Sequence, residues 1–291
     1  MKKIKKLFGE INLTWKRLII FAIITSLYTA LMTLLPALKD TSFHDIAVTF
    51  EVWILFGIII IMNSKSSKES ALKCFVFFLL SQPLIYLIQV PFNNLGFKIF
   101  IYYKYWFILT ILTIPMGFIG YYLKKDKWFG ILILIPIQLL LGIGSYYVYL
   151  KETLFNFPYH LLTALFSFIT MLLYPISVFN NKKNKIISSS FSILIIIILT
   201  IMAFINRKVY NPTLLISGSF ENITFNQNYN VYLENNIGNV YIKYDEGIEN
   251  YLIEGNFIKT GKTFLILEDE NNNKIVFKIN IKNNTFNINK I

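Results

Sequence analysis

The stretch Thr49–Lys65 reads TFEVWILFGIIIIMNSK, a strongly apolar run that carries one acid, Glu51, near its start. A helix needs about 17–25 mostly apolar residues to cross the hydrocarbon core of a bilayer. The run Ile46–Met62 reaches that length only if Glu51 lies inside it. The stretch therefore predicts a membrane helix with a carboxyl group in the bilayer, close to the outer end of the span.

The rest of the chain up to residue 205 repeats this pattern. Only 15% of the 291 residues are charged, against roughly 25% in soluble proteins, and short basic clusters separate the apolar runs. We predict an α-helical polytopic membrane bundle within residues 18–205, with proline inside four of the spans. Seven spans are expected: Leu18–Leu35, Ile46–Met62, Cys74–Phe92, Tyr105–Leu123, Trp128–Leu150, Leu161–Phe179 and Ile186–Ile205.

Basic residues predict the orientation of these spans. The N-terminal segment and the loops after spans two, four and six carry 15 lysines and arginines, whereas the alternate loops carry 4. Cytoplasmic loops are the basic ones, so we expect a multipass plasma-membrane protein with residues 1–17 in the cytoplasm and residues 212–291 outside. The net charge of +12 is then loop charge. Without a recognition motif it does not indicate nucleic acid as a partner.

Composition changes at Asn206, where asparagine becomes frequent and apolar residues alternate with polar ones. NVYLENNIGNVYIKYD (230–245) predicts two strands around an Asn-Gly-containing turn, and KTFLILEDENNNKIVFKINI (262–281) predicts two strands around ENNN. Strands at this spacing indicate a small all-β sandwich of about 80 residues over 212–291. Further short strands are expected at Thr213–Ile216, Ile223–Asn226, Tyr251–Ile253 and Phe286–Ile288.

The segment 240–281 resembles the second half of bacterial immunoglobulin-like surface domains, in which a hairpin of the form T-x-T-L-x-D-x-x-G-N precedes an alternating strand. Gly261, Leu265, Leu267 and Asp269 match, and Asn272 takes the place of the usual glycine, since asparagine also adopts left-handed turns. The resemblance implies an Ig-like sandwich and leaves its role open among spacers, adhesins and partner-binding modules. The membrane part is similar, in composition and layout, to uncharacterised multipass proteins of low-GC Gram-positive bacteria.

Motifs of enzyme chemistry are absent from the sequence, including the phosphate-binding loop, the nucleophile elbow and the zinc-protease helix. The single cysteine, Cys74, excludes an intrachain disulfide, and no cofactor is expected. His44, Asp45, Glu51 and His160 have the chemistry of metal ligands but no diagnostic spacing, so no metal site is predicted. The candidate site is an intramembrane polar cluster in the outer half of the bundle, formed by Glu51, Gln82, Gln89, His44 and His160.

Glu51 leads this cluster because a charge in the bilayer costs a few kcal/mol unless it is paired or hydrated. Two interpretations stay open for it: a functional group that couples to an ion or proton or contacts a ligand, and a structural group that bonds a neighbouring glutamine or lysine. Gln82 and Gln89, seven residues apart on one face of the third span, are candidates for interhelical hydrogen bonds.

Three functions fit this organisation. The first is a non-enzymatic anchor, sensor or partner-binding protein that presents the outer domain 212–291 to an envelope protein or polymer. The second is a transporter or flippase-like protein, or its accessory subunit. The third is an integral-membrane enzyme of envelope lipid or polymer metabolism, for which no catalytic set is visible. The lipid bilayer is the expected partner of the helices, and the sequence does not determine an oligomeric state.

Overall fold

The computed structural model describes residues 7–221, 223–283 and 285–291, so Lys2, Lys3, Lys5 and Lys6 of the predicted basic N-terminus lie outside the described residues. The chain forms two compact units. The helical unit holds the chain up to Leu150 together with Tyr159–Met202, and the β unit holds Lys151–Pro158 and Ala203–Ile291. The predicted boundary after residue 205 is close to this division, apart from the inclusion of 151–158 in the β unit.

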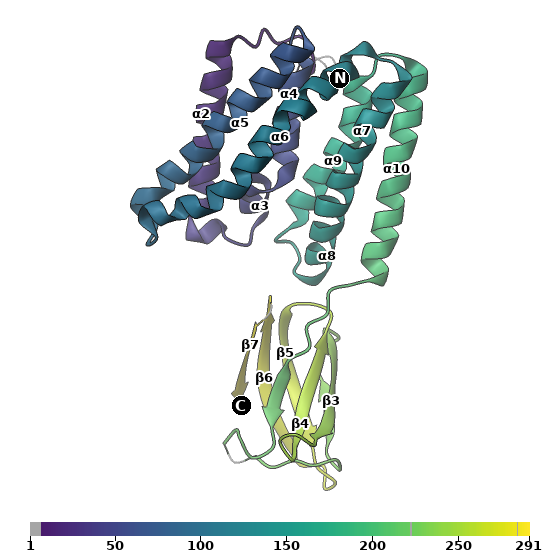
Figure 1. The fold of residues 1–291 in the computed structure, drawn as a ribbon. Helices are drawn as coiled ribbons and strands as arrows, with labels where there is room; N and C mark the ends of the chain where they lie inside the picture. The colour runs from purple at the N-terminus through teal and green to yellow at the C-terminus, as the bar shows by residue number, and fades with distance from the viewer. Residues whose placement is uncertain (1–6, 222, 284) are drawn as a thin grey trace. The chain divides into compact units, whose positions relative to one another are not determined.

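The long helices of the helical unit lie side by side (Figure 1). Short 3₁₀ turns η1 (Pro36–Leu38), η2 (Val90–Phe92), η3 (Gly96–Tyr102) and η4 (Tyr121–Lys125) connect or extend them. A π-helical segment, η5 (Gly142–Tyr147), joins two of the α-helices. The α-helices are α2 (Trp15–Leu34), α3 (Ser42–Val48), α4 (Phe50–Met62), α5 (Ser67–Gln89), α6 (Tyr103–Gly120), α7 (Trp128–Leu141), α8 (Val148–Phe155), α9 (Leu161–Val178) and α10 (Lys182–Ile205).

Six of the described helical segments are long and apolar enough to cross a membrane, and a seventh is added if α3 and α4 form one bent span. Each predicted span overlaps one of them. The main differences are at α5, which begins at Ser67 rather than at Cys74, and at the second span, which is broken before Phe50. The four intrahelical prolines lie within continuous helices, whereas the 48° bend between α3 and α4 lies at Thr49.

The helix α4 occupies the centre of the helical unit. Its sequence FEVWILFGIIIIM is apolar nearly all round, which is the pattern of a helix buried on every side. Ile58 and Met62 pack into one apolar core with α7, α9 and α10. Trp53 and Ile60 pack into a second core with α2 and α5. The two cores therefore share α4, and the buried acid of this helix, Glu51, lies between them.

The basic loops after α4 and α6 meet at one end of the helical unit, as their charge pattern suggested. Tyr121 Oη donates to the Lys65 carbonyl, and Lys124 Nζ donates to the Ser64 carbonyl, at 2.7 Å each. Lys73 is an exception, because it lies within α5 and is buried. Its ammonium group bonds the Leu13 carbonyl at 2.5 Å and pairs with Glu69 at 2.6 Å.

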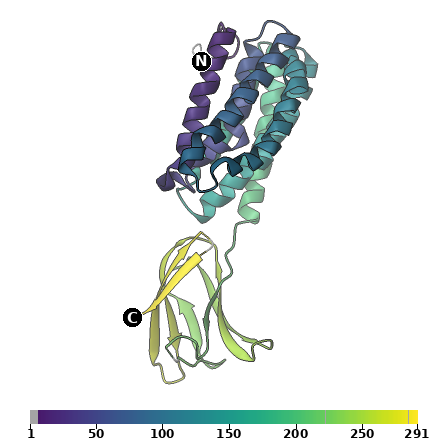
Figure 2. The ribbon, with the colours of Figure 1, turned by 60° about the vertical axis from the view of Figure 1, so that its left-hand side comes forward.

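The β unit contains, within its described residues, seven strands in two antiparallel sheets: β1 (Thr213–Ile216), β2 (Asn230–Leu233), β3 (Gly238–Asp245), β4 (Asn250–Phe257), β5 (Gly261–Glu268), β6 (Lys274–Lys282) and β7 (Thr285–Lys290). The sheet orders are β1-β4-β3 and β2-β5-β6-β7. Alternation along the strands places Ile253 from one sheet and Leu265 and Phe277 from the other in a single apolar core. Figure 2 shows β7 in yellow, beside the other strands of this unit.

The second predicted hairpin is confirmed and the first predicted pair is corrected. β5 and β6 pair directly, and Asn272 in their turn has φ 63°, the left-handed conformation expected there. Hydrogen bonds from the side chain and backbone of Asn273 hold the pKa of the Asp269 carboxyl in this turn below its usual range. By contrast, β2 and β3 do not pair with each other: β2 pairs with β5 and β3 with β4.

Two further points concern the predicted tail. The described residues 223–226 form an irregular segment rather than a strand, although Ile223 and Phe225 are still buried in the core. The described strands of the tail form an antiparallel β region of two sheets. The strand order differs from that of an immunoglobulin constant domain, in which the fifth strand does not pair with the sixth.

The segment 151–158 is held within the β unit by polar contacts. Thr260 N donates to the Phe155 carbonyl at 2.9 Å, and Thr260 Oγ1 bonds Asn156 Oδ1 at 3.0 Å. Lys208 Nζ lies 2.8 Å from Glu152 Oε2, and both side chains are partly buried. These contacts explain why the segment, which includes the end of α8, belongs to the β unit.

Candidate functional site

The break between α3 and α4 positions the leading candidate residue. Thr49 has extended backbone angles, and both its N–H and its hydroxyl bond the Asp45 carbonyl, which closes α3. The helix α4 then restarts at Phe50, so Glu51 is its second residue. Acidic side chains are favoured at this position because the first-turn N–H groups make a helix N-terminus partly positive.

Two serines from other helices surround the carboxyl group of Glu51. The hydroxyl of Ser145 donates to Glu51 Oε1 and lies 2.5 Å from the Ser167 hydroxyl. Glu51 and Ser167 are fully buried, and Ser145 is nearly so. Ser145 lies in the π-helical segment η5, and such segments are frequent at functional sites. The second oxygen, Glu51 Oε2, is buried without a hydrogen-bond partner among the described residues.

A pocket of about 270 Å³ lies beside this carboxyl group. We call it the acidic pocket; Glu51, Thr49 and Ser145 are its polar residues, and Phe50, Trp106 and Leu140 are the main apolar ones. The rings of Phe50 and Trp106 lie 5.8 Å apart between centroids. A single carboxylate in an aromatic and aliphatic wall is chemically suited to hold one positive charge.

Polar contacts continue from Glu51 toward His160. Ser167 Oγ bonds the Thr163 carbonyl at 3.0 Å, and Thr163 Oγ1 lies 3.1 Å from Asp45 Oδ2. The same Asp45 oxygen lies 2.7 Å from His160 Nδ1, and both side chains are buried. The resulting polar chain runs through α9 from His160 and Asp45 to Glu51.

Asp45→Asn is expected to destabilise the helical unit by about 2 kcal/mol, because the one oxygen that bonds both His160 and Thr163 would become a neutral amide oxygen, and hydrogen bonds to a neutral acceptor are weaker than those to a carboxylate. Thermal unfolding of the detergent-solubilised protein measures this loss. Asp40→Asn is the matched control, since Asp40 is exposed and has φ 59°, which asparagine tolerates. Equal unfolding midpoints for the two variants would contradict a structural role of the Asp45 contacts.

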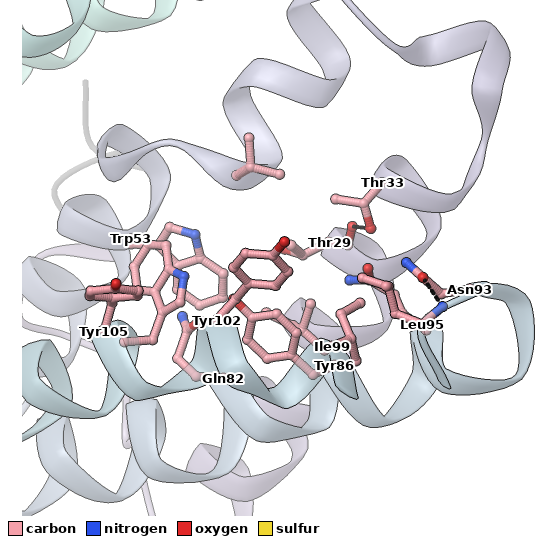
Figure 3. A pocket seen from close by; sticks show the side chains of 14 residues that line it. Thr29, Thr33, Trp53, Gln82, Tyr86, Asn93, Leu95, Ile99, Tyr102 and Tyr105 are labelled. Atoms are coloured by element: carbon pink, nitrogen blue, oxygen red, sulfur yellow. Dashed lines mark hydrogen bonds between the residues drawn. The ribbon is translucent and has the colours of Figure 1, made fainter. Parts of the chain in front are cut away.

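A second pocket, of about 610 Å³, lies between α2, α5 and α6 (Figure 3). We call it the amide pocket; its lining includes Gln82, Gln89, Trp53, Tyr86, Tyr102 and Trp106. Gln82 is buried, and its Nε2 has no hydrogen-bond partner among the described residues. Figure 3 shows Gln82 and the rings of Trp53, Tyr102 and Tyr105 among the side chains that line this pocket. Val48 and Trp106 line both pockets, so the two are neighbours.

The five predicted site residues therefore divide among three places. Gln82 and Gln89 line the amide pocket, as their shared helix face suggested. Glu51 lines the acidic pocket, and His160 connects to it through the polar chain. His44 is half-buried and lines neither pocket. Within residues 7–221, 223–283 and 285–291, no three His, Cys, Asp or Glu side chains gather as a metal site would require.

Sequence reasoning missed Ser145, Ser167 and Thr163, which connect the acids to each other. Serine and threonine are ordinary in membrane helices, and their spacing carries no signal by itself. The glycines around Ser145, in GIGS, indicate by themselves only close helix packing. The π-helical turn at that place supplies a reason that the sequence pattern does not express.

Comparison of the chain with protein-family models, with curated proteins and with solved structures gives no match.

Proposed function

We propose that this chain is a multipass plasma-membrane protein, a non-enzymatic anchor, sensor or partner-binding protein that presents the β unit outside the cell to an envelope protein or polymer. One observation carries the proposal: a separately compact β-sandwich follows the last long apolar helix at once. The helix α10 ends at Ile205 and β1 begins at Thr213. The β unit is therefore tethered close to the membrane surface.

Membrane insertion is supported by the outer faces of the long helices. Large apolar side chains are exposed along α2 and α10, among them Ile20, Ile24, Ile197 and Ile201. Exposed apolar surface on this scale is unfavourable in water and expected against lipid. Counting α3 and α4 as one span gives seven spans, and this odd number supports opposite sides of the bilayer for the two ends of the helical unit's chain.

The cytoplasmic side is assigned from the basic loops, which belong inside by their charge. The β unit then lies outside, where an immunoglobulin-like sandwich would meet envelope components.

Cysteine labelling in intact cells tests the orientation. Lys262→Cys, exposed on the β unit, is expected to react with a membrane-impermeant maleimide. Lys125→Cys, exposed at the end of η4, is the matched control and is expected to react only after permeabilisation. The native Cys74 is buried and contributes little background. Labelling of Lys125→Cys alone in intact cells would reject the proposed orientation.

The role of the β unit is tested by its removal. The experiment uses a strain that lacks the gene and expresses a chain truncated after Pro212. If contact with a partner is the function, this strain is expected to keep the phenotype of the deletion. Full complementation by the truncated chain would reject this function. It would favour the second candidate, a transporter or its accessory subunit, which the broken span and the buried polar chain around Glu51 support.

A further inference from the structure

We propose that the acidic pocket binds the primary ammonium group of a small amine or amphiphile, with Glu51 as its counter-charge. This inference goes beyond the display of the β unit and does not depend on it. It rests on the helical unit alone: on a buried carboxyl oxygen without a partner among the described residues, on the pocket beside it, and on the residues that form the wall.

The carboxyl group of Glu51 is only half satisfied. Its Oε1 accepts from Ser145, while Oε2 is buried without a partner in the part of the chain that the structure describes. None of the salt bridges found among those residues involves Glu51. Buried polar atoms are nearly always hydrogen-bonded, and a buried carboxylate is stable when a cation pairs with it. A ligand that brings both a positive charge and an N–H donor meets both needs.

The wall of the pocket selects an organic cation over an inorganic one. Calcium and magnesium take about six or more oxygen ligands, whereas Thr49, Glu51 and Ser145 are the only hydroxyl or carboxyl side chains among the described residues of the lining. The remaining lining is apolar and includes the indole of Trp106, whose ring face attracts an ammonium group. Apolar side chains also accommodate the carbon atoms of an alkyl chain.

The size and the rim of the pocket fit the same ligand class. A volume of about 270 Å³ is several times the roughly 30 Å³ that one water occupies in the liquid, so an alkylammonium of a few heavy atoms fits. Glu51 itself is 0% exposed, while Phe50 and Leu140 at the rim are 47% and 48% exposed. An apolar rim of this kind, facing lipid in the proposed placement, admits an amine from within the bilayer.

Binding is tested with full-length protein in detergent, with butylammonium chloride as the probe. We expect a saturable change in tryptophan fluorescence, since Trp106 lines the pocket, and a rise in the thermal unfolding midpoint. Equal concentrations of 1-butanol or of sodium chloride are expected to change neither the fluorescence nor the unfolding midpoint. Glu51→Gln, which keeps the size and removes the charge, is expected to weaken binding at least tenfold. Glu10→Gln, at an exposed position, is the matched control and is expected to bind like the wild type.

A second variant guards against misfolding of the first. Gly144 lines the pocket, and a Cβ there would meet only Leu140 Cδ1, at 3.8 Å, among the described atoms. Gly144→Leu therefore fills space in the pocket without altering Glu51, and at least a tenfold loss of affinity is expected. Unchanged affinity in both variants would overturn the proposal. An equal response to 1-butanol would indicate a merely apolar pocket, and competition by sodium chloride would indicate an inorganic ion site; either outcome also overturns it.

The amine could belong to a lipid headgroup or to a free small molecule, and a change of lipid composition distinguishes these two sources. Protein in nanodiscs of phosphatidylglycerol and phosphatidylcholine is compared with protein in nanodiscs in which phosphatidylethanolamine replaces the phosphatidylcholine, so that the fraction of anionic lipid and the surface charge are the same. If the headgroup amine is the ligand, phosphatidylethanolamine weakens butylammonium binding to the wild type by competition. If a free amine is the ligand, butylammonium affinity is the same in both. Absence of butylammonium binding in both lipid compositions and in detergent would reject the ammonium site.

Discussion

Phe257→Ala is expected to destabilise the β unit by about 3–5 kcal/mol, the usual cost of removing a buried phenylalanine. Phe257 is fully buried in the core that both sheets share. Two glycines make room for it, because a Cβ at Gly255 would clash with its ring and one at Gly238 would lie 2.9 Å from the ring. The loss of the ring would leave a cavity that these rigid neighbouring strands cannot close.

Pulse proteolysis of the full-length protein in urea measures this effect, because cleavage within residues 212–291 reports unfolding of the β unit alone. Tyr241→Ala is the control, since Tyr241 is exposed on β3 and loses only an exposed hydrogen bond to Glu254, so stability is expected to fall by about 1 kcal/mol or less. If Phe257→Ala and Tyr241→Ala unfold at the same urea concentration, the proposed common core is wrong.

Gly117→Ala is expected to lower the stability of the helical unit by about 1–3 kcal/mol, the range found for overpacked sites. A Cβ at position 117 would lie 3.0 Å from the Ala71 Cα and from the Ser70 carbonyl oxygen. Both are backbone atoms of α5, which cannot move aside as a flexible side chain can. The same close approach allows the Ser70 hydroxyl to bond the Gly117 carbonyl at 2.8 Å, and separating the helices would lengthen this bond.

Gly57→Ala provides the matched comparison within the same unit. Position 57 lies in α4, and a Cβ there would meet no described atom within 4 Å. Alanine also favours the helix over glycine by about 1 kcal/mol. We therefore expect Gly57→Ala to unfold at or above the wild-type temperature, in the same detergent, and Gly117→Ala to unfold below it. The reverse order would show that α5 and α6 do not pack closely at Gly117.

Apolar run length and alternation of apolar with polar residues could be predicted from the sequence, because both depend only on residues that are close together in the chain. Apolar run length predicted the long helices, and the alternation in KTFLILEDENNNKIVFKINI predicted β5, β6 and their turn at Asn272. The pairing of strands that are far apart in the chain could not be predicted in the same way. NVYLENNIGNVYIKYD predicted two strands at the right places, but its strands entered different sheets because each buries its apolar face against a different neighbour.

The candidate site shows the same limit. The acid in TFEVWILFGIIIIMNSK, its depth within a helical segment and the helix face shared by Gln82 and Gln89 follow from the sequence. The partner of Glu51 does not, because Ser145 lies 94 positions away, and neither does the break at Thr49, which no proline or glycine marks.

The sequence by itself determined that the chain has long apolar helices followed by alternating strands, since run length and periodicity act residue by residue. The tertiary structure decided which side chains share a buried place. It set α4 between two apolar cores, brought the π-helical turn with Ser145 against Glu51, and left one carboxyl oxygen beside a pocket. The reason is physical: a buried carboxyl group must find its partners in space, and packing of distant helices determines which groups lie within reach.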